Sequence, residues 1–167
     1  MRLEEAERIA GNLKAFLAPA CERLEIAGSI RRRRPEVGDI DLVLIPKDWL
    51  AVRDMLKRLG KVKISGRKIT RVIMDGGTQV DTYYATPGNF ATLLLIRTGS
   101  AENNIRLCTL ARKRGWHLAA SGEGLFNEHG ERIAGDSEES IYQALGLRYQ
   151  EPWERNGYGA GDVTGPT

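Results

Sequence analysis

The chain has 167 residues, of which 41% are hydrophobic and 28% are charged. Its length is close to the ~150 residues of one ordinary domain, and its composition excludes a disordered chain and a membrane-spanning one. Lys and Arg number 25 against 22 Asp and Glu, and the excess lies in residues 1–130, which hold 22 basic and 15 acidic residues. This surplus is typical of a polyanionic partner and equally of a solvated surface, so charge alone does not decide the function.

The N-terminus and the cysteines indicate the cellular compartment. The first ten residues are rich in charge and contain no apolar block, so we expect no signal peptide, no membrane contact and a cytoplasmic location. Cys21 and Cys108 lack the spacing of a zinc site or of a disulfide framework, and we interpret both as buried free thiols.

The N-terminal half predicts helices alternating with short strands. Apolar residues at helical spacing indicate an opening helix, whereas period-two alternation indicates the strands. Gly76-Gly77 joins the last two strands as a hairpin, and Asp48 caps the second helix. The predicted elements are helix 3–17, strand 23–27, a helical turn at 30–34, strand 39–45, helix 48–59, and strands 61–64, 68–74 and 78–84.

The C-terminal half returns to helical spacing after Pro87. We expect helices at 87–98, with Pro87 in the first turn, and at 102–114, short strands around Gly122 and Gly124, and a last helix that carries Ile141 and Leu145. Asp136, with Glu139 three residues later, forms a capping-box pattern for that helix. Several glycines beyond Pro152 predict a flexible tail at 157–167.

Two aspartates in one predicted strand are the first sign of chemistry. Asp39 and Asp41 lie two residues apart, so both carboxylates project from one face while Ile40 and Leu42 bury the other. Their repulsion is best relieved by a hard divalent ion, above all Mg²⁺. An antiparallel neighbouring strand would place Asp81 beside them and complete a two-metal site. On the D-x-D pattern alone, a solvated strand face is the stronger interpretation.

The segment before the aspartates favours an anion site. Gly28-Ser29 ends a strand and begins a helical turn, which leaves backbone N–H groups and a hydroxyl for phosphate oxygens. The four arginines at 31–34 follow at once, and guanidinium groups bind phosphate in a bidentate way. A solvated basic turn accounts for two or three of them, and we expect Arg32 to face the site.

The segment 28–41, which reads G-S-I-R-R-R-R-P-E-V-G-D-I-D, resembles the G-S-x-R-R…G-D-x-D signature of family X DNA polymerases. These enzymes are nucleotidyltransferases related to polymerase beta. The second half is similar in order and spacing to their nucleotide-selecting lobe and C-terminal end, at 98–107, 111–115, 124–126 and 149–155. The resemblance spans about residues 5–156. It implies an α+β fold, with a polymerase beta-like palm of mixed sheet and flanking helices at 1–86 and a small α+β lobe, the thumb or fingers, at 87–156.

The resemblance also implies roles for single residues. Asp39, Asp41 and Asp81 match the catalytic metal ligands, and Asp81 matches the acceptor of the primer 3′-hydroxyl proton. The implied cofactor is Mg²⁺, with Mn²⁺ as a second candidate. Nucleotide contacts are implied for Gly28, Ser29, Arg32, Gly38, Gly99 and Asn104.

Three departures from the family pattern affect the expected properties. Ile96 and Arg97 replace an aromatic pair, which weakens the expected discrimination against ribonucleotides, and Gln79 replaces a basic residue near the primer. Cys108 replaces an arginine on the template side, so we expect low fidelity. No helix-hairpin-helix module precedes residue 5 and no phosphoesterase domain follows, so we expect the compact form with a palm and one lobe only.

The expected partners are gapped or primer-template DNA and a dNTP, and a DNA ligase is a candidate protein partner. We expect the protein to be a monomer associated with the nucleoid. DNA held through backbone charge implies strongly salt-dependent binding. The predicted DNA contacts are Lys61, Lys63, Arg67, Lys68, Arg71, Arg106, Arg112, Lys113 and Arg114. Two alternatives stay open: a template-independent or protein-modifying nucleotidyltransferase, and a non-catalytic DNA-binding scaffold.

Overall fold

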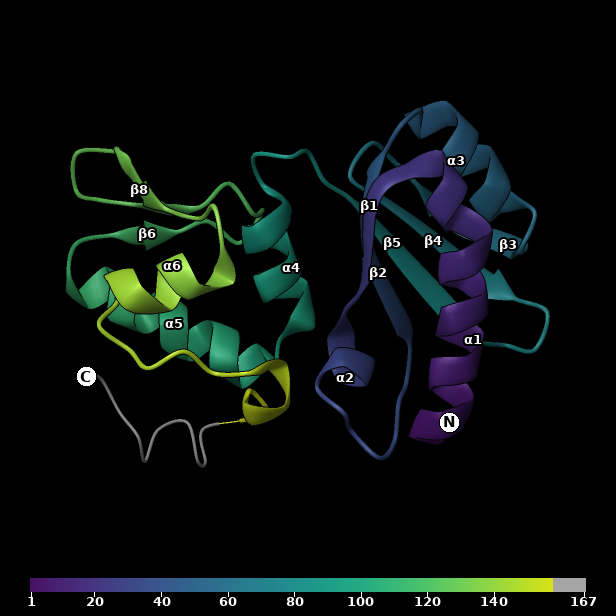
Figure 1. Ribbon diagram of the computed structural model, residues 1–167, viewed down its shortest axis with the longest axis horizontal. Helices are drawn as coiled ribbons and strands as arrows, with labels where there is room; N and C mark the ends of the chain where they lie inside the picture. The colour runs from purple at the N-terminus through teal and green to yellow at the C-terminus, as the bar shows by residue number, and fades with distance from the viewer. Residues whose placement is uncertain (158–167) are drawn as a thin grey trace. The chain divides into compact units, whose positions relative to one another are not determined.

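The computed structural model describes residues 1–157 and divides the chain into two compact units, Met1–Pro87 (unit 1) and Gly88–Thr167 (unit 2), which Figure 1 shows. The division lies one residue from the domain boundary that the sequence predicts. The flexible tail predicted at 157–167 lies outside the described residues except for Gly157. Over residues 1–157, every helix is too short or too polar to cross a bilayer.

Unit 1 is built on a five-stranded sheet in the order β1 (Cys21–Ile26), β2 (Ile40–Pro46), β5 (Gln79–Tyr84), β4 (Ile69–Met74) and β3 (Gly60–Ser65). β2 and β5 are parallel, whereas the other three neighbouring pairs are antiparallel. The mixed sheet is thus confirmed. The sequence analysis expected the strand of Asp81 to run antiparallel to β2, and this expectation is wrong. β3 and β4 reverse the direction of the chain, so β5 lies beside β2 and runs parallel to it.

The core of unit 1 lies between the sheet and two helices. α1 (Leu3–Leu17) and α3 (Trp49–Lys57) cover the same face of the sheet in Figure 1. Ile40, Leu42 and Leu44 of β2 are fully buried in this core, as the alternation of the sequence predicts. Two short elements, η1 (Ala18–Ala20) and α2 (Gly28–Arg31), flank β1. The face opposite the helices carries the acidic residues.

Unit 2 combines helices with a small antiparallel sheet. Leu95, Leu107, Ile141 and Tyr142 are buried in its own core. This architecture confirms the predicted α+β lobe. Its elements are α4 (Phe90–Thr98), α5 (Ala101–Lys113), β6 (His117–Leu118), β7 (Leu125–Phe126), β8 (Arg132–Ala134), α6 (Glu138–Ala144) and η2 (Pro152–Glu154), with the strands in the order β6-β7-β8.

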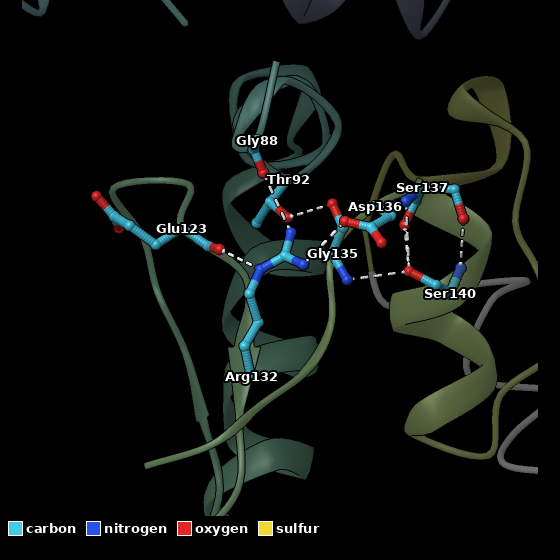
Figure 2. A network of polar contacts seen from close by, with 8 residues as sticks. All are labelled: Gly88, Thr92, Glu123, Arg132, Gly135, Asp136, Ser137 and Ser140. Atoms are coloured by element: carbon cyan, nitrogen blue, oxygen red, sulfur yellow. Dashed lines mark hydrogen bonds and ion pairs between the residues drawn. The ribbon is translucent and has the colours of Figure 1, made fainter. Parts of the chain in front are cut away.

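The cap of α6 differs from the prediction by one residue. Ser137, not Asp136, is the N-cap, and its hydroxyl accepts from the backbone N–H of Ser140 at 3.1 Å. The Ser140 hydroxyl completes the capping box in place of Glu139. The reason is visible in Figure 2, where the Asp136 carboxylate is already bound to Arg132, at 2.9 Å.

Arg132 connects the β7–β8 hairpin to the beginning of unit 2. Its Nε donates to the carbonyl of Glu123 at 2.9 Å, and its Nη2 donates to the carbonyl of Gly88 at 3.1 Å, as Figure 2 shows. Thr92 of α4 adds a hydroxyl hydrogen bond to the carbonyl of Gly135 at 3.2 Å. These bonds fix the N-terminal end of α4 against the hairpin, and α4 leads directly into the predicted nucleotide-binding turn.

Candidate active site

The three predicted acidic residues gather on the open face of the unit 1 sheet. Asp41 on β2 and Asp81 on β5 are register partners across the parallel pair. Asp39 lies just before β2, and the side-chain amide of Gln79 donates to its Oδ2 at 3.2 Å and to Asp81 Oδ2 at 3.3 Å. Gln79 therefore connects the two ends of the acidic group. Gln79 and Asp81 are two residues apart in β5, so their side chains lie on the same face of the sheet.

Arg71 contacts the same acidic group. It is the register partner of Asp81 on β4, and its guanidinium makes two parallel bonds to the carboxylate, Nε to Oδ1 at 2.8 Å and Nη2 to Oδ2 at 3.1 Å. These hydrogen bonds and the negative charge of Asp81 raise the pKa of Arg71. A residue predicted as a DNA contact thus lies in the candidate active site and neutralises the third acid.

The donor types suit a divalent cation. Three carboxylates offer only oxygen atoms, which hard ions such as Mg²⁺ and Mn²⁺ prefer. As the side chains lie, however, no three His, Cys, Asp or Glu residues within 1–157 form a group able to hold a metal ion. Both oxygens of Asp81 accept from Arg71 instead. The residues fit the ion by the chemistry of their donor atoms.

Gly28 lies directly against the acidic group. Its φ of +62° is in the left-handed region, and a Cβ at this position would lie 2.2 Å from Oδ2 of Asp41. Glycine is therefore required both for the backbone conformation and for the close approach of the turn to the carboxylate. Ser29 and Arg32 follow in the turn of α2, and the N–H of Arg32 donates to the carbonyl of Gly28 at 3.2 Å. Gly38, in contrast, has open space around it.

We expect Gly28→Ala to lower the free energy of unfolding by about 1–3 kcal/mol, because a methyl group would strain the backbone and displace the Asp41 carboxylate. Gly11→Ala is the matched control. Gly11 is exposed in α1, and a Cβ added there would meet nothing within 4 Å, so we expect a gain of up to about 1 kcal/mol from helix propensity. Urea unfolding of both variants measures the difference, and equal stabilities would contradict the close packing at Gly28.

In unit 2 the predicted nucleotide-binding turn joins α4 to α5. Gly99 has a φ of +73° and is followed by a cis peptide bond to Ser100. The Ser100 hydroxyl caps α5 by accepting from the N–H of Asn103 at 3.2 Å, and its own N–H donates to the carbonyl of Arg155 at 2.9 Å. The C-terminal segment at 152–155 therefore holds the turn in place, which the sequence pattern did not indicate.

Asn104 lines a groove on α5. Its Nδ2 donates to the carbonyl of Ile96 at 2.9 Å, whereas its Oδ1 is buried and has no hydrogen-bond partner within residues 1–157. The groove has a volume of about 380 Å³. It brings Asn104 together with Arg112 and with Cys108, which the sequence predicts on the template side, and it adds Ile105 and His117, which the sequence patterns did not assign to a site. Helical spacing to Cys108 and Arg112 along α5 is the signal that could have found Ile105.

The predicted DNA contacts of unit 1 lie mostly at the edge of the sheet. Lys61 and Lys63 are exposed on the edge strand β3, and Lys68 is exposed in the turn that follows. Arg67 in the same turn places its guanidinium 5.5 Å from the ring centroid of Trp49. Exposed lysines on an edge strand also prevent edge-to-edge pairing, so their position is compatible with either role.

The predicted DNA contacts of unit 2 differ in exposure and in the hydrogen bonds that they make within the unit. Arg112 and Lys113 are exposed at the end of α5. Arg106 instead donates to the side chains of Asn103, at 3.3 Å, and of Gln150. Arg114 donates to the carbonyl of Ala144 at 2.7 Å and lies over the ring of Trp116. Arg106 and Arg114 therefore have structural partners within the unit.

Comparison with known proteins agrees with these features. The family model of the DNA polymerase beta thumb matches residues 93–156, which lie within unit 2. The curated protein DNA polymerase/3′-5′ exonuclease PolX of Bacillus subtilis (strain 168) is 32% identical over 149 residues, or 85% of this chain. The chain spans 26% of the length of that relative. The thumb match and the relative together support the resemblance seen in the motifs, and the chain is a family X polymerase-like protein.

Proposed function

We propose that the chain catalyses DNA-directed transfer of a nucleotide from a dNTP to a primer 3′-hydroxyl, as a gap-filling polymerase in DNA repair. The observation that carries the proposal is the acidic group on the open face of the sheet, with Asp41 and Asp81 in register and Asp39 connected to Asp81 through Gln79. The thumb match in unit 2 and the identity to PolX support a polymerase rather than another class of nucleotidyltransferase.

The proposed roles follow the chemistry of each residue. Asp39, Asp41 and Asp81 would hold Mg²⁺ or Mn²⁺, which lowers the pKa of a bound hydroxyl and neutralises phosphate charge. Asp81 would accept the proton of the primer hydroxyl as a general base.

The α2 turn and unit 2 would bind the incoming nucleotide. Backbone N–H groups beside Gly28, with Ser29, Arg32 and Gly38, would hold the phosphate oxygens of the dNTP. Gly99 and Asn104 in unit 2 would contact the sugar and the base. The side-chain oxygen Oδ1 of Asn104, which has no hydrogen-bond partner within residues 1–157, would accept a hydrogen bond from a donor on the nucleotide.

DNA would be bound mainly through phosphate charge. The exposed residues Lys61, Lys63, Arg67, Lys68, Arg112 and Lys113 are the proposed contacts. A protein that neutralises six phosphates would lose about 10³-fold in affinity between 50 and 200 mM salt. Fluorescence anisotropy of a labelled gapped duplex over that range of salt measures this slope, and a flat slope would argue against backbone binding.

The deciding experiment is extension of a labelled primer on a duplex with a one-nucleotide gap, in Mg²⁺ and in Mn²⁺. Each dNTP and each rNTP is offered separately at low and at moderate salt. We expect insertion of the nucleotide complementary to the template base, together with some ribonucleotide insertion because Ile96 and Arg97 replace the aromatic pair of the family. Untemplated addition would favour a template-independent transferase instead.

A non-catalytic DNA-binding scaffold is the second candidate, and the bond between Arg71 and Asp81 favours it. A guanidinium that neutralises the third acid would keep the site inactive if it never leaves. This alternative predicts salt-dependent DNA binding with no extension in either Mg²⁺ or Mn²⁺.

A further inference from the structure

The carboxylate of Asp81 is enclosed by hydrogen-bond donors. Arg71 donates to both of its oxygens, and the amide of Gln79 lies within 3.4 Å of Oδ1 and 3.3 Å of Oδ2. The side chain of Asp81 is only 6% exposed, whereas that of Arg71 is 34% exposed. A planar guanidinium that makes two parallel bonds to a carboxylate is among the strongest pairings that a protein side chain forms. Asp81 is thus already neutralised without any metal ion.

Two cations therefore compete for one carboxylate. A divalent ion needs a lone pair of Asp81, whose carboxylate offers about four, and Arg71 and Gln79 each donate to both of its oxygens, Arg71 at the shorter distances. We propose that Arg71 is a positioning residue that holds Asp81 in a closed arrangement, so that a divalent ion at the acidic group competes with Arg71 for the Asp81 carboxylate. The inference rests on the proposed function, because it takes Asp39, Asp41 and Asp81 as the site for the ion.

The surroundings of Arg71 allow the displacement. Its register partner on the outer side, on β3, is Ile64, which is exposed and carries no charge that would restrict the guanidinium. The side chain of Arg71 is itself one-third exposed, so it reaches solvent by rotating away from Asp81. Asp81 cannot move in the same way, because it lies almost fully buried in the sheet between its register partners Asp41 and Arg71. Opening the pair is a movement of Arg71.

The test is a titration of the protein with Mn²⁺, followed by electron paramagnetic resonance of the free ion, with neither DNA nor nucleotide present. We expect Arg71→Gln to bind Mn²⁺ about tenfold more tightly than the native chain, which corresponds to about 1.4 kcal/mol. The matched control is Arg58→Gln, which removes the same charge from unit 1 at an exposed position directly after α3. We expect its affinity to change by less than about twofold, since an exposed charge is screened.

An Arg71→Gln affinity equal to or weaker than that of the native chain would overturn the proposal. An equal gain in Arg58→Gln would overturn it too, because the gain would then come from the net charge of unit 1 and not from the Asp81 carboxylate. The double variant Arg71→Gln with Asp81→Asn should lose the gain, since the ligand set free by the first change is removed by the second.

If the circular dichroism spectrum shows that Arg71→Gln does not fold, Arg71→Lys is the variant that tests the proposal. Lysine retains the charge and loses the planar fork, so we expect Mn²⁺ affinity between those of the native chain and Arg71→Gln. Unchanged or weaker binding by Arg71→Lys would contradict the competition. The Mn²⁺ titration and the primer extension separate the two proposals. If the native chain extends the primer but Arg71→Gln does not change the affinity for Mn²⁺, this inference alone is overturned. If Arg71→Gln binds Mn²⁺ more tightly but the native chain extends no primer, the proposed function alone is overturned.

Discussion

Asp41→Asn is expected to lower the rate of nucleotide insertion by about 10³-fold or more, equivalent to about 4 kcal/mol of activation free energy. Asp41 lies in register with Asp81 and against the backbone of Gly28, so it is central to the acidic group. An amide of nearly equal size keeps the packing at Gly28 but removes the charge that a divalent ion and the reacting phosphates require. Single-nucleotide insertion on a gapped duplex measures the loss.

Asp75→Asn is the matched control for this variant. It removes the same charge from the same unit, at an exposed position in the β4–β5 turn, and we expect insertion within about twofold of the native rate. DNA affinity and the circular dichroism spectrum of Asp41→Asn should match those of the native chain. Retained insertion by Asp41→Asn, or an equal loss in Asp75→Asn, would remove Asp41 from the catalytic group.

Arg155→Ala is expected to destabilise unit 2 by about 3–5 kcal/mol. Arg155 is fully buried, and its Nη1 donates to Oε2 of Glu138 at 2.8 Å. Its guanidinium also donates to the carbonyl of Gln150 and to the hydroxyl of Tyr149, both at 3.0 Å. The rings of Tyr142 and Tyr149 lie at 5.5 and 5.4 Å from the guanidinium carbon. Alanine would leave the Glu138 carboxylate buried without its cation.

Urea unfolding followed by circular dichroism measures this loss, with Arg148→Ala as the control. Arg148 also pairs with a glutamate, at 3.1 Å from Glu154, but its side chain is 45% exposed. A surface ion pair contributes at most about 1 kcal/mol, so the control should unfold close to the native midpoint. A similar small effect for Arg155→Ala would mean that the buried pair adds nothing to stability. The variant keeps the backbone carbonyl of residue 155 that accepts from the N–H of Ser100, so it tests whether the buried side chain holds this segment against the turn at Gly99 and Ser100.

Local patterns in the sequence were sufficient for most elements of the fold. The helix predicted at 3–17 has the same bounds as α1, because its apolar stripe and its proline-limited end are both local signals. The alternation around Asp41 correctly placed Ile40 and Leu42 in the core and the carboxylates on the opposite face. The Gly28-Ser29 turn was identified because glycine at a strand end is itself a conformational signal.

The direction of β5 and the partner of Asp81 were decided by the tertiary structure. The predicted strands 68–74 and 78–84 leave a loop at 75–77, and the structure has this loop, in which the N–H of Met74 donates to the carbonyl of Thr78. This register places Arg71 on β4 opposite Asp81. The neighbour of β5 on its other side is β2, and the two strands run parallel, which the sequence did not predict. The sequence by itself determined which residues could form the acidic group, whereas the direction in which β5 joins β2, which depends on contacts between segments distant in the chain, decided that Asp41 and Asp81 are register partners.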